Sequence, residues 1–465
     1  MNMNRISAPI RACVRRHVRQ AFTLIELMIS IALAALIMAG IHFIFSTTSR
    51  TAGMAHGLVS VVANARAAEP VMRQDLHGAA MDGPFFMIRS GRTFAFLNRD
   101  EEVAAGGNPA MKRPYRTDML MFFARGRFPR QTGNDGQYVA PMSSDEAYIW
   151  YGHGRRPNLG QPTGTLQKWT HYLPGQGTFA DNPNNYYAKD WVLSRVVMLL
   201  REPDPITGNV LSDAGQPQAC IQRSPTAQAD SLAPFSLNSQ STGPNVYMVQ
   251  WSRYDLAATS IAGYRAILNN AILLNAPATP WWSHNHFNFR FQCNPTPTKP
   301  LDSFGMARTV PCFLLGCVSF AVEFAGDFLS QDPVSGAVMA DLPDGQIDFI
   351  RENLGGGEVA NRVRWYGLPR DVDGDGVIDW RDVVPVRDLT TTLTPLGFER
   401  VGPVYQADYN SPPPPPDTPY IYIVAWGPDT AALPRPAMIR VVLSVDDPDG
   451  RLADSQSYEY VFALP

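Results

Sequence analysis

The sequence lacks a strong net charge. Its 39 Lys and Arg residues nearly balance its 42 Asp and Glu residues, which leaves a formal net charge of −3 over 465 residues. A basic surface that binds nucleic acid by releasing counterions is therefore not indicated, and we expect no nucleic-acid partner. Charged residues make up only 17% of the chain against 45% hydrophobic residues, a balance typical of folded proteins.

The sequence also lacks the motifs that mark common catalytic sites. It has no GxSxG turn, HExxH helix, CxxC pair or defensible pair of spaced carboxylates. The run Gly355–Gly357 lacks the strand and lysine of a phosphate loop, and His284 and His286 lack a recognisable third metal ligand. The sequence therefore predicts a protein that is not an enzyme, and no internal repeat is evident.

Cysteine is scarce, with five residues in the chain. Cys13 lies in the N-terminal leader described below, so four cysteines remain in the body. An even number suits disulfides outside the cytoplasm, and four cysteines can pair in three ways, among which the sequence does not choose. Reduced, buried cysteines are the alternative. The four are Cys220, Cys293, Cys312 and Cys317.

One long apolar run stands near the N-terminus. It extends from Phe22 to Phe45, about 24 residues, which is enough to span a bilayer and longer than the apolar region of an ordinary signal peptide. We therefore expect residues 22–45 to be a retained transmembrane helix. Basic residues precede it, which predicts a cytoplasmic start and an exported body; they are Arg5, Arg11, Arg15, Arg16 and Arg19.

The segment Gln20-Ala21-Phe22-Thr23-Leu24-Ile25-Glu26-Leu27 resembles the processing motif of type IV pilins and pseudopilins. The resemblance implies that a prepilin peptidase removes residues 1–21, cutting between Ala21 and Phe22, and that the new N-terminal Phe22 is methylated. Ala21 stands where the family usually has Gly. An uncleaved membrane anchor is the alternative.

Glu26 becomes the fifth residue of the mature chain, where this family keeps a carboxylate inside an apolar helix. The resemblance implies that Glu26 pairs with the N-terminal ammonium of a neighbouring subunit during assembly, so that both desolvated charges are compensated. The alternative is a carboxylate that reaches the lipid headgroups.

Residues 46–80 should continue the helix as an amphipathic segment that packs on the soluble body. Apolar residues recur there at helical spacing. Pro70 removes a backbone donor and clashes with the preceding turn, so we expect a break or kink near it. The predicted apolar stripe comprises Leu58, Val61, Val62, Ala65, Met72 and Leu76.

Residues 84–465 should form a large β-rich head, which gives the whole chain an α+β fold. The 40 prolines and 36 glycines favour short strands joined by turns. One helix is expected at Leu256–Leu274. Short β-branched and aromatic runs predict strands at Thr93–Leu97, Met119–Phe123, Ala147–Tyr151, Val192–Leu200, Val246–Trp251, Cys317–Phe324, Tyr420–Trp426, Met438–Val445 and Tyr458–Leu464.

Several patches of the body occur in the order seen in J-type minor pseudopilins of type II secretion and in the similar W-type minor pilins. The resemblance implies a minor subunit that joins other pilin-like subunits in a pseudopilus or pilus, with a position at the tip as one option. It further implies anchoring in the inner membrane and a head in the periplasm or on a cell-surface filament. The patches are Met72–Leu76, Trp191–Arg195, Val318–Phe324 and the region from Leu433 to Leu464.

The segment Asp371–Asp382 fits the ligand spacing of an EF-hand-like calcium loop. Gly376 allows the turn, and Asp382 replaces the usual closing Glu. A solvated acidic turn is the alternative, although its carboxylates would repel one another without a cation. We expect Ca²⁺ to order this part of the head. The ligands would be Asp371, Asp373, Asp375, the carbonyl of Val377, Asp379 and Asp382.

Three function hypotheses follow. The first is the minor pilin-like subunit. The second is a membrane-anchored, calcium-dependent extracytoplasmic binding module that never polymerises. The third is an anchored enzyme with an unrecognised site.

Two Pro-Asp-Gly segments, 341–345 and 446–450, are interpreted as β-turns. Pro412–Pro416 is interpreted as a polyproline II spacer.

Overall fold

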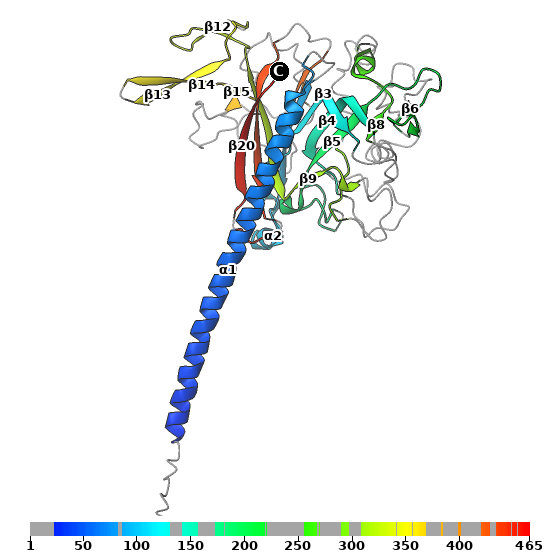
Figure 1. The fold of residues 1–465 in the computed structure, drawn as a ribbon. Helices are drawn as coiled ribbons and strands as arrows, with labels where there is room; N and C mark the ends of the chain where they lie inside the picture. The colour runs from blue at the N-terminus through cyan, green and yellow to red at the C-terminus, as the bar shows by residue number, and fades with distance from the viewer. Residues whose placement is uncertain are drawn as a thin grey trace, which may run out of the picture. The chain divides into compact units, whose positions relative to one another are not determined.

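The protein consists of two units, Met1–His56 and Gly57–Pro465. Figure 1 shows a computed structural model of the chain. The structure describes residues 23–81, 86–130, 142–156, 173–180, 182–218, 220, 255–266, 269, 290–296, 308–340, 342–355, 357–368, 383–384, 399–400, 420–427, 434–447, 449–452 and 454–465.

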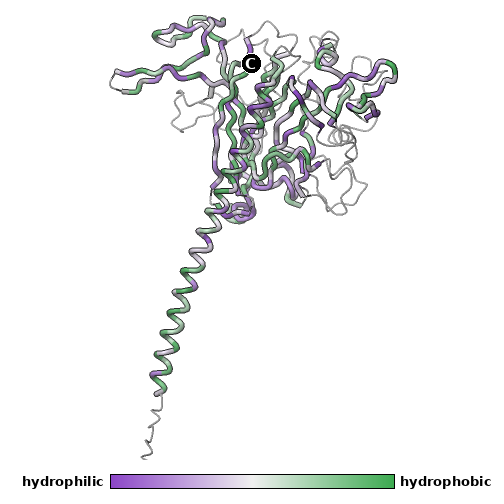
Figure 2. Tube along the Cα trace, viewed as in Figure 1, coloured by the Kyte–Doolittle hydropathy of each residue, from purple (hydrophilic) through white to green (hydrophobic). Residues whose placement is uncertain are grey.

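The first helix, α1, runs over 54 residues from Leu24 to His77. Its N-terminal part is long and apolar enough to cross a membrane, and no residue from 23 to 50 is buried within the chain. Figure 2 shows hydrophobic residues recurring along this part of the helix. An apolar helix without partners in its own chain needs lipid or other helices around it.

The second part of α1 belongs to the larger unit and buries one face against it. Of the predicted stripe, Val61, Ala65, Met72 and Leu76 are buried, whereas Leu58 is 42% exposed. The expected break at Pro70 is wrong, because α1 continues through it to His77. Pro70 lies on the exposed side, and buried residues before and after it, such as Ala68 and Met72, hold both segments on the head.

A nine-stranded sheet forms the larger layer of the head, and most neighbouring strands in it are antiparallel. Strand β2 pairs with β1 and β9 with β5 outside the main order, and β8 pairs with β5 in parallel. In spatial order the main strands are β17 (Glu399–Arg400), β18 (Tyr420–Trp426), β1 (Phe86–Ala95), β3 (Met119–Pro129), β4 (Ser143–His153), β5 (Val192–Leu200) and β8 (Leu256–Ala257), with β2 at Arg113–Arg116 and β9 at Cys312–Leu315.

A five-stranded sheet forms the second layer. Its longest pairing joins β10 to β19, with Val322 opposite Val441 and Phe324 opposite Ile439. These strands hold the Val318–Phe324 and Ile439–Leu443 patches of the family resemblance, which the fold brings into register. The sheet order is β16 (Val383–Val384), β15 (Trp365–Tyr366), β10 (Cys317–Gly326), β19 (Pro436–Val445) and β20 (Gln456–Ala463).

Within the described residues, further short elements lie outside the two large sheets. They include the two-stranded sheets β6–β7 (Val210–Leu211 and Pro217–Gln218), β11–β12 (Ser330–Gln331 and Val338–Ala340) and β13–β14 (Phe349–Gly355 and Glu358–Val363), the helix α2 (Arg99–Ala104), the 3₁₀ turns Pro109–Met111 and Ala188–Asp190, and the helical residues 261–266.

Asp118 joins the two sheets from the turn between β2 and β3. Its carboxylate is fully buried and accepts hydrogen bonds from the backbone N–H of Gly91 in β1, at 2.9 Å, and of Val322 in β10, at 2.8 Å. Arg116 pairs with the same carboxylate, with Nη2 2.6 Å from Oδ2. Both carboxylate oxygens therefore accept hydrogen bonds, and these bonds hold the two sheets together.

The expected α+β class is confirmed, with a long apolar helix followed by a β-rich head of several sheets. The predicted helix at Leu256–Leu274 is wrong at its start, because Leu256 and Ala257 pair with β5 and helical residues begin only at Ile261. Pairing with a buried strand overrides the helical preference of these two residues. The predicted strand Val246–Trp251 lies outside the described residues.

Candidate assembly site

Thr23 and Glu26 form a reciprocal cap at the start of α1. The Glu26 carboxylate accepts hydrogen bonds from the Thr23 backbone N–H at 2.9 Å and from its hydroxyl at 2.8 Å. In return the Thr23 hydroxyl accepts from the Glu26 backbone N–H at 3.3 Å. This is a capping box, which satisfies two donors that a helix start leaves open. The Thr-x-x-Glu spacing was a readable signal for it that our sequence analysis missed.

The Glu26 carboxylate lies on an exposed apolar helix surface. Its neighbours Leu24 and Met28 are 77% and 63% exposed. A carboxylate at membrane depth is costly unless a positive charge compensates it. Ala21 and Phe22, the residues of the predicted cut, lie outside the described residues.

A buried ion pair fixes the last turns of α1 to the nine-stranded sheet. The Asp75 carboxylate, in α1, accepts hydrogen bonds from Nε and Nη2 of Arg195, in β5, each at 2.7 Å. The Tyr151 hydroxyl, in β4, donates to the same carboxylate at 2.5 Å. Burial, and then the charge of Asp75, raise the pKa of Tyr151 well above its usual value. Such a satisfied buried pair fixes both position and orientation.

Sequence reasoning had noted the segments that hold Asp75 and Arg195 but not their pairing. The two residues stand 120 positions apart, and no local spacing rule joins a helix to a strand over that distance. Only the packing of α1 on β4 and β5 brings them together.

The C-terminal acidic turn also contacts α1 within the larger unit. The Asp447 carboxylate, which pairs with Arg451 at 2.7 Å, lies 3.0 Å from where a Cβ on Gly57 would be. The hydrogen bond from Arg451 lowers the pKa of Asp447 to about 2. The predicted β-turn at 446–450 is confirmed by a 2.8 Å bond from the Gly450 N–H to the Asp447 carbonyl.

Residues 16–41, which include the start of α1, match the model of the prokaryotic N-terminal methylation motif. This match supports a type IV pilin-like or pseudopilin subunit. It implies processing by prepilin peptidase, assembly with other pilin subunits, and a structural subunit rather than an enzyme. Together with the single apolar helix, it is consistent with inner-membrane anchoring. No curated protein and no solved structure matches the chain.

Two of the four body cysteines lie close to each other. The Cys312 thiol donates to the backbone carbonyl of Arg308 at 3.7 Å, and its interaction with Cys293 lowers the pKa of Cys293 and, together with burial, raises that of Cys312. Their backbones support this proximity, because Cys312 is the partner of Ser194 in the β5–β9 pairing. Both the Cys293 sulfur and the Ser194 hydroxyl lie against Gly154, in the space that a Cβ there would occupy. All four body cysteines, including Cys220 and Cys317, are thiols in this structure.

The predicted calcium ligands in Asp371–Asp382 lie outside the described residues, as do His284, His286 and Pro412–Pro416. Within the part of the chain that the structure describes, no group of three or more His, Cys, Asp or Glu residues could hold a metal ion. The calcium site therefore stays a prediction from sequence.

Proposed function

We propose that the chain is a minor subunit of a type II secretion pseudopilus or a type IV pilus. The observation that carries this proposal is the methylation-motif match over residues 16–41, which overlaps the start of an apolar helix whose side chains are exposed there. A helix of this kind is complementary to the helices of like subunits. The order of the sequence patches described above supports a minor subunit of the J or W type.

In the proposed mechanism, prepilin peptidase releases the mature chain at Phe22, and the helix then packs among the helices of neighbouring subunits. Glu26 exchanges its local bonds to Thr23 for the N-terminal ammonium of a neighbour. The buried Asp75–Arg195 ion pair joins α1 to β5, so it fixes the orientation of the head on the last turns of the helix. The head then presents its surface to other subunits or to cargo.

The test begins with the mature N-terminus. We expect intact-mass and N-terminal peptide spectrometry of the chain, co-produced with a prepilin peptidase and its assembly machinery, to find methylated Phe22. Ala21→Arg should leave only the uncut form, whereas Glu26→Gln should still be cut but fail to enter sheared filaments. A wild-type chain found only as the intact Met1 form, in the presence of an active peptidase, contradicts the proposal and favours the non-polymerising calcium-dependent module.

We also propose that Asp371–Asp382 binds Ca²⁺ in a structural role, on the basis of its ligand spacing. Calcium should raise the melting temperature of the wild-type chain, and Asp375→Ala should abolish that rise. The control is Asp332→Ala, which removes an exposed carboxylate that only caps a local turn. A wild-type melting temperature that is the same in calcium and in chelator disproves the site.

We propose, finally, that Cys293 and Cys312 form a disulfide when the head is exported. The interaction between their thiols supports this one pair, and Cys220 and Cys317 are not included in it. The two thiols lose two protons and two electrons, and the electrons pass to the disulfide of a periplasmic thiol oxidase, which is reduced to a dithiol. The pair would therefore report that the head lies in an oxidising compartment.

A further inference from the structure

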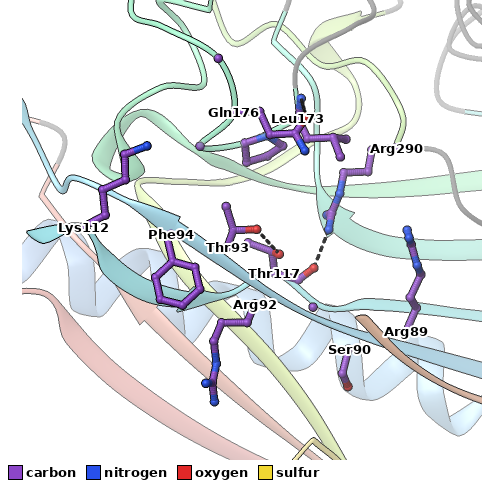
Figure 3. A pocket seen from close by; sticks show the side chains of 14 residues that line it. Arg89, Ser90, Arg92, Thr93, Phe94, Lys112, Thr117, Leu173, Gln176 and Arg290 are labelled. Atoms are coloured by element: carbon purple, nitrogen blue, oxygen red, sulfur yellow. Dashed lines mark hydrogen bonds between the residues drawn. The ribbon is translucent and has the colours of Figure 1, made fainter. Parts of the chain in front are cut away.

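Cys293 lies in a segment that hydrogen bonds fix beside the end of β4. Its backbone N–H donates to the carbonyl of Arg155 at 3.0 Å, and the Arg155 N–H donates to the carbonyl of Phe291 at 2.8 Å. At the start of the segment, the Arg290 guanidinium donates to the Thr117 carbonyl at 2.6 Å, as Figure 3 shows. Cys293 itself is 0% exposed. Another molecule therefore cannot reach its sulfur while the head stays folded.

Cys312 differs from Cys293 in its exposure. It is the first residue of β9, lies opposite Ser194 of β5 and is only partly buried. Its thiol donates to the backbone carbonyl of Arg308 at 3.7 Å. A thiol is a weak hydrogen-bond donor, so this bond holds the sulfur only loosely. Cys312 is therefore the member of the pair that an external thiol or disulfide can reach.

The surroundings of the Cys293 sulfur favour its thiolate form. The sulfur and the Ser194 hydroxyl both lie against Gly154, which has no side chain to occupy that space. The interaction with Cys312, the Ser194 hydroxyl and the charge of Arg156 together outweigh burial and lower the pKa of Cys293. Hydrogen-bond donors and nearby cations are the groups that stabilise a thiolate in proteins. Cys293 is therefore inaccessible but chemically prepared to attack a neighbouring sulfur.

Two properties decide which part each sulfur takes in thiol–disulfide exchange. The sulfur that meets the external molecule must be accessible, and a thiolate leaves a disulfide faster when the pKa of its thiol is lower. Cys312 has the first property, and Cys293 has the second. Formation and reduction of the bond retrace one path, so both should pass through the same mixed disulfide.

We propose that the pair exchanges with external thiols and disulfides through Cys312 only, that Cys293 is the buried thiolate that closes the bond on oxidation and leaves it on reduction, and that Ser194 is a positioning residue for that thiolate. The inference rests on the Cys293–Cys312 disulfide proposed above. It adds a separate part for each sulfur and a third residue that acts on one of them.

Oxidation takes two steps. The Cys312 thiol loses its proton and attacks the disulfide of the oxidase, so that a mixed disulfide forms, the oxidase disulfide breaks, and the first oxidase sulfur leaves and takes up a proton. The Cys293 thiolate then attacks the Cys312 sulfur, the mixed disulfide breaks, and the second oxidase sulfur leaves as a thiolate. That thiolate takes up the proton that Cys293 had released to water. The oxidase has gained two electrons and is a dithiol.

The test uses glutathione disulfide as the external disulfide and the reduced, full-length chain in a neutral detergent, with peptide mapping of each cysteine after acid quenching. Cys293→Ser should accumulate glutathione on Cys312, because no thiolate remains beside it to displace the adduct. Cys312→Ser should gain glutathione on Cys293 at least about tenfold more slowly, because that sulfur is buried. The wild type should form the Cys293–Cys312 bond, with glutathione present only transiently on Cys312.

The outcomes distinguish this inference from the disulfide on which it rests. A wild-type chain that forms no Cys293–Cys312 bond overturns both, whether or not Cys312 keeps glutathione. A different result overturns the inference alone: the wild type forms the bond, yet Cys312→Ser gains glutathione on Cys293 as fast as Cys293→Ser gains it on Cys312.

Ser194→Ala, with both cysteines present, tests the positioning residue. Below neutral pH it should slow the release of glutathione from Cys312 about threefold, because a thiolate fraction about tenfold smaller is partly offset by a nucleophilicity about threefold greater. The difference should vanish at high pH, which a merely structural role would not produce. The matched control is Ser90→Ala, which removes another buried serine hydroxyl, from β1 beside the pocket drawn in Figure 3, and should release glutathione at the wild-type rate. A pH profile of Ser194→Ala that matches the wild type excludes Ser194 from this role.

Discussion

Replacing Cys312 with Ser removes one sulfur of the proposed Cys293–Cys312 disulfide and should lower the stability of the head. The size of this loss depends on the length of the loop that the disulfide closes. The bond would close a loop of about 20 residues, for which the chain-entropy relation gives a stabilisation of about 3 kcal/mol. The larger unit has about 400 residues, and at about 2.1 cal/mol/K per residue of unfolding entropy this corresponds to a fall in Tm of about 3–4 °C.

The assay compares melting curves of protein secreted into an oxidising compartment, with and without a reductant. The wild type should lose about 3–4 °C on reduction, whereas Cys312→Ser should melt at the lower temperature in both buffers. Cys220→Ser, which alters a buried cysteine outside the pair, should respond to reductant as the wild type does. Peptide mapping without reduction that finds Cys293 bonded to Cys220 or Cys317, or that finds both thiols of the pair free, refutes the reasoning.

The remaining predictions concern two buried carboxylates. Asp75→Asn leaves the Arg195 guanidinium uncompensated and should cost about 3–5 kcal/mol in urea unfolding, whereas Glu69→Gln, which breaks an exposed pair with Arg73, should cost under about 1 kcal/mol. Equal costs would show that Asp75 does not anchor α1. Burial raises the pKa of Asp348 to about 6 from 3.8. The folded state therefore holds a proton that the unfolded chain has lost, and wild-type stability should fall as pH rises from about 4 to about 6. Asp348→Asn should lack this part of the pH dependence of Tm; an unchanged slope contradicts the assignment.

Local sequence patterns predicted the elements that depend on neighbouring residues. Short β-branched and aromatic runs located strands such as β5 and β19, and the apolar run located the start of α1. The same rules failed at Pro70 and at Leu256, where contacts from distant residues outweigh the local preference. Pro70 is tolerated because α1 is held on the head at both sides of it, and Leu256 is extended because it pairs with Leu199.

The candidate sites divide in the same way. The methylation motif and the Thr23–Glu26 cap are contiguous, so the sequence alone was sufficient to find the first and could have revealed the second. The Cys293–Cys312 interaction and the Asp75–Arg195 ion pair join residues from separate segments, for which no spacing rule exists. Placing Cys312 beside Ser194 required strand register, because register decides which side chains face one another.

The sequence by itself determined the N-terminal features of this protein, which are an apolar helix, a processing motif at its start and a carboxylate in its first turn. Because those features depend only on the order of residues along one helix, they can be recognised without knowledge of the fold. The tertiary structure alone decided how the head holds that helix and how its two sheets are joined. Asp75 meets Arg195 only because the last turns of α1 pack on β4 and β5 of the nine-stranded sheet, and Asp118 meets Gly91 and Val322 only because the two sheets pack together.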